Sequence, residues 1–401
     1  MKKTLTILII LIVIAAGIGF YLISRPTPSG ETGDDRGFFP VGNLFDFFTG
    51  REGDNAGQTI STPTNNLETE DIATPEKIID ESIAGYELIT ISDNDYLVYA
   101  EQSTGHIYTA DLTDEELTFK RISNTTIANP LSVLFTTDTN HLYAFIEDRD
   151  GVITSINIPL EAISGETEKN NLVRRQSNFL AQPAINRETG RIFYLKRFND
   201  DVVGLVANPD LSGAGQVWRT GLLSWQASWA GTGSIILSQP PAWSLSRNLY
   251  SLDLNREMTD KILSNKSGLT ALPSPDGKQL LYSESAGNNL NLKLKNLDTG
   301  TEKTLAIKTL TDKCVWQNDA GAIYCGVSER ISAGQYPDEW YQGKISFPND
   351  DIWVYIIDDS TLFRLTSINR NLDVVNLKVK DNMIWWQNKK DGSLWSVFLR
   401  Y

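Results

Sequence analysis

Short runs of hydrophobic residues, separated by polar turns, return about every 45 residues from Tyr86 to the C-terminus. Each unit reads as a short strand, a tight turn, a hydrophobic strand, a second turn, an aromatic-bearing strand and a polar strand. The clearest unit spans residues 269–305, with a turn at 274–278 and the hydrophobic strand at 279–282. A repeat of this length, made of four strands and no helix, is typical of a β-propeller.

Seven copies follow from the hydrophobic strands, and six or eight remain possible because the third copy is degenerate. The apolar centres of these second strands are Leu97, Leu142, Ile192, Ile235, Leu280, Ile323 and Ile384. Asp, Asn and Gly precede most of them, as tight hairpins require. The third strands carry aromatic residues that we expect to pack between sheets, namely Tyr108, Tyr250, Trp353 and Trp395.

The two ends of the repeat region complement each other. The last copy has three strands, near residues 374–379, 382–387 and 393–399, and it lacks a fourth. Residues 75–80 resemble the fourth strands of other copies. We therefore expect this N-terminal strand to complete the final blade, which closes the ring and removes two open sheet edges.

The first residues predict a membrane anchor. Residues 5–23 are apolar and follow Lys2 and Lys3, and a helix of this length would reach roughly 28 Å, the thickness of a hydrocarbon core. The positive-inside rule then places the N-terminus in the cytoplasm and the propeller outside it. A cleaved signal peptide is the alternative. The predicted division is an anchor at 1–24, a linker at 25–75 and a propeller at 76–401.

The linker is rich in Pro, Gly, Thr, Asn and acidic residues, which predicts a flexible stalk. Residues 37–48 interrupt it with five Phe residues. This segment either docks on the propeller or the membrane surface, or serves as a recognition motif for a partner.

Composition excludes several classes of function. The formal net charge of −14 argues against nucleic acid, which needs a basic surface. The sequence shows no glycine-rich phosphate loop between a strand and a helix, so we expect no nucleotide. The two histidines, His106 and His141, lie at different turns of different copies, which disfavours a catalytic triad or a His-rich metal site. We expect no cofactor and no metal.

The two cysteines, Cys314 and Cys325, flank one predicted hairpin. If Asn318 pairs with Gly321, the cysteines face each other at a position where Cα atoms are about 4.5 Å apart, at the short end of disulfide geometry. With the propeller outside the cytoplasm, a structural disulfide is favoured over two buried thiols.

The sixth copy carries a long insert between its second and third strands, at residues 326–350. Propeller loops of this kind share a face with the connections between blades, and that face commonly carries ligand sites. Trp243 occupies the equivalent loop of the fourth copy. The candidate binding residues are Trp243, Tyr336, Asp338, Glu339, Trp340, Tyr341 and Lys344. Either Trp340 and Tyr341 stand exposed as a binding hot spot, or the insert folds over the ring and its aromatic residues seal the channel.

Residues 274–278 (SPDGK) with Leu280, Leu281 and Tyr282, and the motif at 297–301 (LDTGT), resemble the WD40-like repeats of TolB-type propellers. The propeller domain of prolyl-oligopeptidase-type peptidases is similar. The TolB resemblance implies a role in protein interaction. This sequence departs from TolB in lacking its N-terminal α/β domain, and it lacks a hydrolase domain, so peptidase activity does not transfer.

The leading hypothesis is a non-catalytic module that binds a protein, a peptide or an envelope polymer through the face bearing the insert. One alternative is a glycoside hydrolase or lyase that uses Asp and Glu at the channel mouth. Another is an architectural component of the cell envelope.

Overall fold

The computed structural model describes residues 58–59 and 73–399, except 92, 115, 124–125, 128, 138–140, 148–152, 160–174, 177–178, 287–288 and 368–369. All of these residues belong to the compact unit Phe39–Tyr401. Among them, no helix is both long and apolar enough to cross a membrane. The predicted anchor at 5–23 and the Phe-rich segment 37–48 lie outside the described residues.

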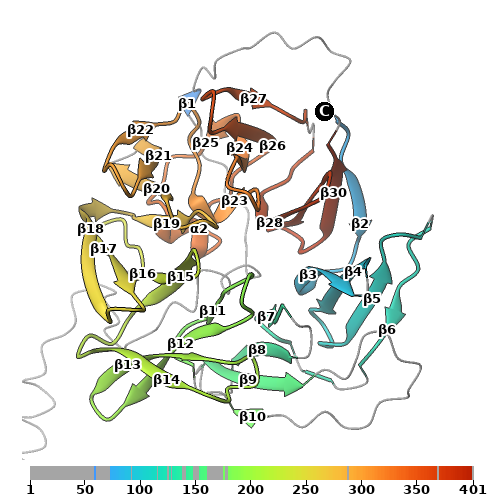
Figure 1. The fold of residues 1–401 in the computed structure, drawn as a ribbon. Helices are drawn as coiled ribbons and strands as arrows, with labels where there is room; N and C mark the ends of the chain where they lie inside the picture. Colours follow the sequence, from blue (N-terminus) through green and yellow to red (C-terminus); the bar gives the residue numbers. More distant parts are fainter. Residues whose placement is uncertain are drawn as a thin grey trace, which may run out of the picture. The chain divides into compact units, whose positions relative to one another are not determined.

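Seven four-stranded antiparallel sheets follow one another along the chain as the blades of a propeller (Figure 1). Blade 1 contains β3 (Ile83–Ile91), β4 (Asn94–Glu101), β5 (Ile107–Asp111) and β6 (Lys120–Arg121). Blade 2 contains β7 (Ser132–Phe135), β8 (His141–Glu147), β9 (Ile153–Pro159) and β10 (Arg175–Gln176). Blade 3 contains β11 (Ala184–Ile185), β12 (Ile192–Phe198), β13 (Asp201–Ala207) and β14 (Gly215–Thr220). Blade 4 contains β15 (Gln226–Ala230), β16 (Ser234–Ser238), β17 (Ser246–Asp253) and β18 (Met258–Ser267).

The last three blades carry the insert and the ring closure. Blade 5 contains β19 (Thr270–Pro273), β20 (Gln279–Ala286), β21 (Asn289–Asn296) and β22 (Glu302–Thr304). Blade 6 begins after the 3-10 helix η3 (Thr311–Lys313) and contains β23 (Cys314–Trp316), β24 (Ala322–Ser328), β26 (Asp350–Ile356) and β27 (Leu362–Arg364). Blade 7 contains β28 (Val374–Lys380), β29 (Met383–Asn388), β30 (Leu394–Phe398) and β2 (Glu76–Ile79). The prediction of an all-β seven-bladed propeller is confirmed.

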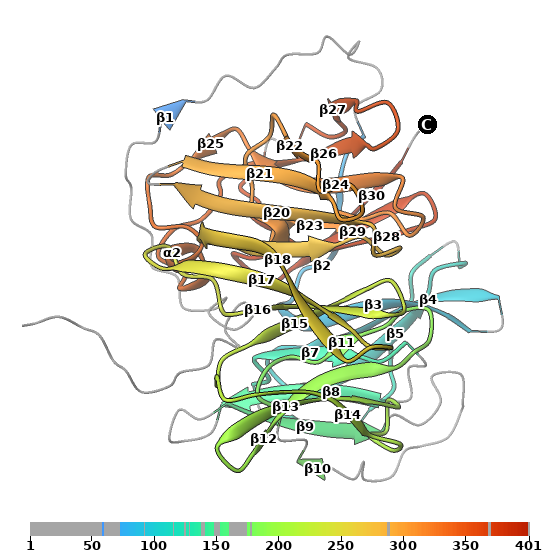
Figure 2. The same ribbon diagram turned by 60° about the vertical axis from the view of Figure 1, so that its left-hand side comes forward.

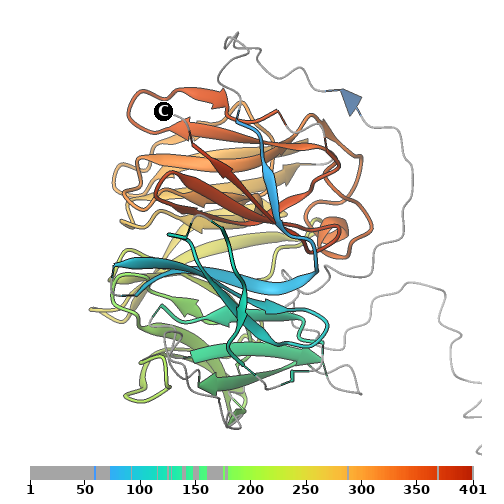
Figure 3. The same cartoon turned by 90° about the vertical axis from the view of Figure 1, so that its right-hand side faces the viewer.

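Strand β2 closes the ring as predicted. It pairs antiparallel with β30, with Glu76 opposite Ser396 and Lys77 opposite Trp395. Figure 3 shows β2, in blue, running beside the dark red β30. The order β2-β30-β29-β28 supplies the fourth strand of blade 7 from the other end of the domain. β30 is thereby paired on both sides, and the free edges that β30 and β2 would have in an open ring are removed.

The second strands form the hydrophobic interior because they pack against a neighbouring sheet on both faces. All seven residues predicted as their centres lie in second strands and are buried. Aromatic residues of the third strands pack in the same layers, and Trp353 and Trp395 are buried there. Tyr108 and Tyr250 are partly buried at the equivalent positions. The repeat therefore encodes a series of inter-blade cores rather than one central core.

The cysteine hairpin has the predicted register. Cys314 lies opposite Cys325, and Trp316 lies opposite Ile323. The backbone N–H of Gln317 donates to the carbonyl of Ala322, so the alternating pattern places the cysteines at a non-hydrogen-bonded pair. They form a disulfide with Cα atoms 4.1 Å apart. The predicted structural disulfide is confirmed.

Candidate functional site

We call the face that carries the connections between blades and the loops between second and third strands the insert face. The blade 6 insert lies there and contains β25 (Arg330–Ile331) and α2 (Asp338–Tyr341). In Figure 2, α2 lies at the same edge as the end of β20 and the beginning of β21. β25 pairs with β1 (Gln58–Thr59). These two residues belong to the predicted stalk, and the composition of the stalk did not predict that they pair with a strand.

The insert turns its aromatic residues inward. Trp340 and Phe347 are completely buried, and Tyr336 and Tyr341 nearly so. They form one hydrophobic cluster with Leu290 of blade 5, Leu310 of the connection between blades 5 and 6, and Val375 of blade 7. The alternative in which Trp340 and Tyr341 stand exposed as a hot spot is therefore wrong. The loop is hydrophobic because it packs on the ring, and burial of its aromatic side chains holds it there.

A fully enclosed ion cluster lies beneath these aromatic residues. Lys313 Nζ lies 2.5 Å from Asp350 Oδ2 and also contacts Asp373 Oδ1, and all three side chains have no exposed surface. The ammonium group lies 4.5 Å from the ring centroid of Phe347 and 5.6 Å from that of Trp340. We call Lys313, Asp350 and Asp373 the buried triad.

The buried triad holds the insert through hydrogen bonds to one carboxylate. Asp373 Oδ2 accepts from Trp340 Nε1 at 2.9 Å and from the backbone N–H of Phe347 at 3.0 Å. Burial raises the pKa of Asp350 to about 7, and repulsion from Asp373 adds to this in spite of Lys313. The two carboxylates outweigh the effect of burial on Lys313 and raise the pKa of its ammonium group.

A second contact ties the insert to the ring at Asp312. Tyr341 donates its hydroxyl hydrogen between both carboxylate oxygens of Asp312, each 3.1 Å away. Burial raises the pKa of Asp312 to about 6. The same desolvation raises the pKa of Tyr341, so the tyrosine stays protonated as a donor.

The insert also reaches blades 4 and 5. Asp338 Oδ2 accepts from the backbone N–H of Trp243 at 2.6 Å, and burial raises the pKa of Asp338. The backbone carbonyl of Tyr336 accepts from Ser285 Oγ at 2.8 Å. The first of these bonds joins the Trp243 loop of blade 4 to the insert of blade 6, and the second joins the insert to β20 of blade 5.

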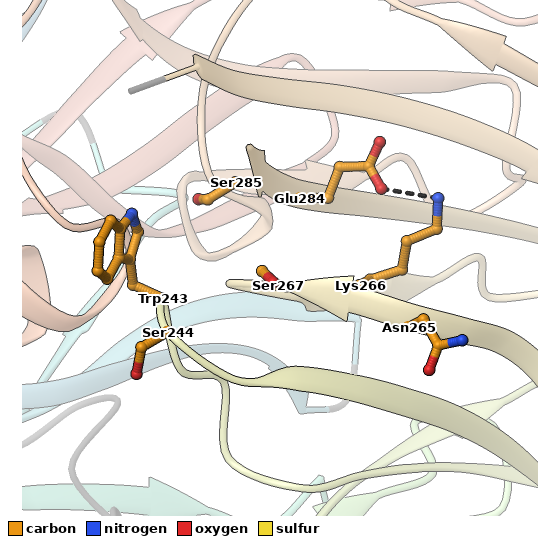
Figure 4. A pocket seen from close by; sticks show the side chains of 7 residues that line it. All are labelled: Trp243, Ser244, Asn265, Lys266, Ser267, Glu284 and Ser285. Atoms are coloured by element: carbon orange, nitrogen blue, oxygen red, sulfur yellow. Dashed lines mark ion pairs between the residues drawn. The ribbon is translucent and has the colours of Figure 1, made fainter. Parts of the chain in front are cut away.

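A pocket of about 500 Å³ opens beside this junction, between blades 4 and 5. Figure 4 shows Trp243 at one side of it, on the loop before β17, and the ion pair of Lys266 and Glu284 at the other. The lining residues are Trp243, Ser244, Asn265, Lys266, Ser267, Glu284 and Ser285. Trp243, predicted as a binding residue, is half-buried and lines this pocket.

Charge at the pocket is arranged around Glu284. Its carboxylate oxygens lie 2.7 Å from Lys266 Nζ and 2.5 Å from Lys293 Nζ. Burial opposes ionisation of Glu284, but hydrogen bonds from both lysines outweigh it and lower its pKa. Glu284 is therefore an ionised, doubly paired carboxylate.

The remaining predicted residues do not line the pocket. Glu339 Oε2 accepts from the backbone N–H of Gln335 at 2.8 Å, so it stabilises the turn into α2. Lys344 is exposed on the insert. The structure thus brings Trp243 and Asp338 together, while Tyr336, Trp340 and Tyr341 form the support beneath.

Sequence reasoning missed the polar half of the pocket and the buried triad. Lys266 lies on the outer strand β18, Lys293 on the third strand β21 and Glu284 near the end of the second strand β20, and a charged residue is ordinary at each of these positions. Lys313 and Asp373 are 60 residues apart and carry no motif. One signal for the pocket was present in the sequence. In a four-stranded blade 4, the end of the outer strand β18 lies beside the loop that carries Trp243, so polar residues at that strand end could have been added to the site.

A second group of charges crosses the channel side of the ring. Glu87 in β3 lies 2.7 Å from Lys378 in β28 and 3.3 Å from Arg187, which follows β11. We call these residues the inter-blade triad, because they join blades 1, 7 and 3. Burial alone would raise the pKa of Glu87, but Arg187 and Lys378 lower it to about 2.

Within the described part of the chain, no group of three or more His, Cys, Asp or Glu side chains is placed to hold a metal ion.

No family model matches the sequence, and no curated protein matches it. The solved structures similar to it include an oligogalacturonate lyase in complex with manganese, at 11% identity and a TM-score of 0.55, covering 86% of this chain and 98% of that one. Oligogalacturonate lyase from Vibrio parahaemolyticus is similar at 9% identity and a TM-score of 0.52, covering 86% and 99%. TolB from Acinetobacter baumannii aligns at 12% identity and a TM-score of 0.38, covering 78% of each chain.

These likenesses concern the fold. At such identities the two lyase structures show a likeness of fold alone. The predicted WD40-like propeller is confirmed as a fold by the seven four-stranded sheets of this chain. The activity of the lyases is a property of those proteins.

Proposed function

We propose that this protein is a non-catalytic binding module whose ligand site is the pocket beside Trp243 on the insert face. The observation that carries the proposal is the pocket itself, which combines an aromatic side chain with polar groups on rigid strands. The volume of the pocket lies in the range of ligand sites, and convergent polar groups are what fix the orientation of a ligand in such sites. The insert supports the pocket, since Asp338 fixes the backbone of Trp243.

The chemistry of the pocket favours binding over catalysis. Its titratable lining groups are Lys266 and Glu284, which are paired with each other. A general acid needs a pKa near the working pH, whereas the pKa of Glu284 is lowered. The pocket therefore offers recognition without a proton donor suited to bond cleavage.

Glycan cleavage is the second candidate, and the buried triad is the observation that favours it. Asp350 and Asp373 flank one ammonium group, and the pKa of Asp350 is raised to about 7, as for a catalytic acid. Both carboxylates are completely enclosed under Trp340 and Phe347, and Lys313 neutralises part of their charge. A substrate would reach them only if the insert left the ring, so this candidate ranks second.

The test is co-sedimentation of the full-length chain with washed, protein-free envelope polymer from the native host. We expect Trp243→Ala to weaken binding by roughly tenfold, as loss of a central aromatic anchor does. Met258→Ala is the control, because Met258 is an exposed apolar residue of the same blade away from the pocket. Equal binding by Trp243→Ala and wild type would overturn the site, and release of soluble saccharide fragments would favour the enzyme.

We further propose that residues 5–23 anchor the protein in the cell membrane with the propeller outside the cytoplasm. The length of the apolar run and the preceding Lys2 and Lys3 support this. Alkaline extraction should leave the chain in the membrane pellet, and protease added to intact spheroplasts should degrade the propeller. Release of the chain by alkali would overturn the anchor.

A further inference from the structure

We propose that the Trp243 pocket binds a neutral, hydroxyl-rich sugar ring of a saccharide chain. This inference rests on the proposed function and names its ligand class. Of the seven lining residues, none has an aliphatic side chain. One is an indole, and the others carry hydroxyl, amide, ammonium or carboxylate groups.

The single aromatic side chain suits a sugar ring. The axial C–H groups of a pyranose form a flat, weakly positive surface, and the face of an indole is weakly negative, so the two stack. Trp243 is half-buried at one side of the pocket, with its backbone held by Asp338 at 2.6 Å. The neighbouring turn is also fixed, since the N–H of Gly268 donates to the carbonyl of Ala242 at 2.9 Å. A loop whose backbone is already fixed loses little ordering entropy when a ligand stacks on it.

Polar groups occupy the rest of the wall, where ring hydroxyls would lie. Ser244 and the side-chain amide of Asn265 are exposed at the rim, and Ser267 is half-exposed between them. The Asn265 backbone N–H donates to Asn248 Oδ1 at 3.1 Å, which fixes the strand end that carries its amide. Amides and hydroxyls both donate and accept, as do the hydroxyls of a sugar.

The charges of the wall favour a neutral ligand. The lining contributes one positive charge, Lys266, and one negative charge, Glu284, which are ion-paired at 2.7 Å. Lys293, which does not line the pocket, also pairs with Glu284 at 2.5 Å. The lining itself therefore has no net charge that an ionic ligand would need. A peptide anchored by an apolar side chain is also a poor match, because such anchors fill apolar pockets.

The experiment is calorimetric titration of the full-length chain with three neutral probes: maltoheptaose, cellohexaose and hexa-N-acetylchitohexaose. We expect at least one probe to bind wild type and Met258→Ala alike. Trp243→Ala should weaken that binding at least about tenfold, and Trp243→Phe should keep most of it because it retains an aromatic face. Raising the salt concentration from 0.05 M to about 0.5 M should leave the affinity within twofold, since a neutral ligand is not screened.

Two results would overturn the inference: none of the probes binds wild type, or Trp243→Ala binds the probe as tightly as wild type. Failure of the ligand class is separable from failure of the proposed function. If no probe binds while Trp243→Ala still loses the envelope polymer, the site is a binding site for another class of ligand. If Trp243→Ala changes neither the binding of the probes nor the binding of the envelope polymer, the proposed function fails as well.

Discussion

The buried triad and the inter-blade triad contain the same kinds of groups in opposite proportion. In the buried triad, one ammonium group lies between two carboxylates, and the pKa of Asp350 is raised to about 7. In the inter-blade triad, one carboxylate lies between two cations, and the pKa of Glu87 is lowered to about 2. Desolvation raises the pKa of both Asp350 and Glu87. Glu87 has two positive partners and Asp350 has one, and this difference explains why only the pKa of Glu87 ends below its ordinary value.

The pKa values of the two lysines also depend on the number of oppositely charged partners. Burial lowers the pKa of both, but Asp350 and Asp373 together reverse it for Lys313. For Lys378, Glu87 is a single negative partner and Arg187 a competing positive charge, so the pKa stays lowered. The first triad holds a loop on the ring, and the second joins blades that are distant in sequence.

The largest effect should follow from Lys313→Met, which leaves two carboxylates enclosed without their cation. Removing one partner of a buried ion pair costs roughly 3–5 kcal/mol of unfolding free energy. Urea denaturation followed by tryptophan fluorescence measures it. Lys344→Met is the control, since Lys344 is exposed on the same insert. A loss below about 1 kcal/mol would mean that the triad contributes little to folding.

A smaller loss, roughly 1–3 kcal/mol, is expected for Glu87→Gln, because the amide retains polar contact while Lys378 loses its counter-charge. The same denaturation measurement applies, with the exposed Glu188→Gln beside Arg187 as the matched substitution. Equal stability of the two variants would show that the channel side is wet enough to solvate Lys378.

The two triads should also respond to pH in opposite directions. Asp350 binds its proton more tightly when folded, so its stabilising contribution is lost as pH rises from 3.8 to about 7. Glu87 binds its proton less tightly when folded, so its contribution is lost as pH falls from 4.5 to about 2. Urea midpoints across this range should lose the upper slope in Asp350→Asn and the lower slope in Glu87→Gln. Unchanged slopes in both variants would contradict the assignment.

The smallest effect should come from Arg187→Gln. The Arg187 side chain is 63% exposed, so its ion pair with Glu87 is screened by water and contributes about 0–1 kcal/mol. Comparing the unfolding free energies of Arg187→Gln and Glu87→Gln, both from urea denaturation, separates the contributions of the two partners of Glu87. A loss as large as that of Glu87→Gln would identify Arg187, rather than Lys378, as the dominant partner.

Much of the fold was predictable because it depends on patterns of residues that are close together in the sequence. The hydrophobic second strands and their turns predicted seven blades, and the missing fourth strand of the last copy predicted the pairing of β2 with β30. The spacing of Cys314 and Cys325 predicted their register. Each of these inferences needs only neighbours along the chain or the closure of a ring.

The candidate site was predicted only in part. The Trp243 loop and the insert were assigned to the same face, and the structure joins them through Asp338. The residue types of Trp340 and Tyr341 could not predict whether these side chains are exposed, since aromatic residues occur both at interfaces and in cores. Their burial depends on Leu290, Leu310 and Val375, which come together from blade 5, from the connection to blade 6 and from blade 7.

The sequence by itself determined the repeat, the strand that closes the ring and the register of the cysteine hairpin, because strand periodicity and turn chemistry act over a few residues. The tertiary structure fixed the number of blades at seven and joined Cys314 to Cys325. Tertiary structure alone decided which charges meet. Glu87 and Lys378 are 291 residues apart, and Lys266 reaches Glu284 only where blades 4 and 5 adjoin. Such pairs leave no local pattern, since a charged residue on a strand is compatible with solvent until the ring has placed its partner beside it.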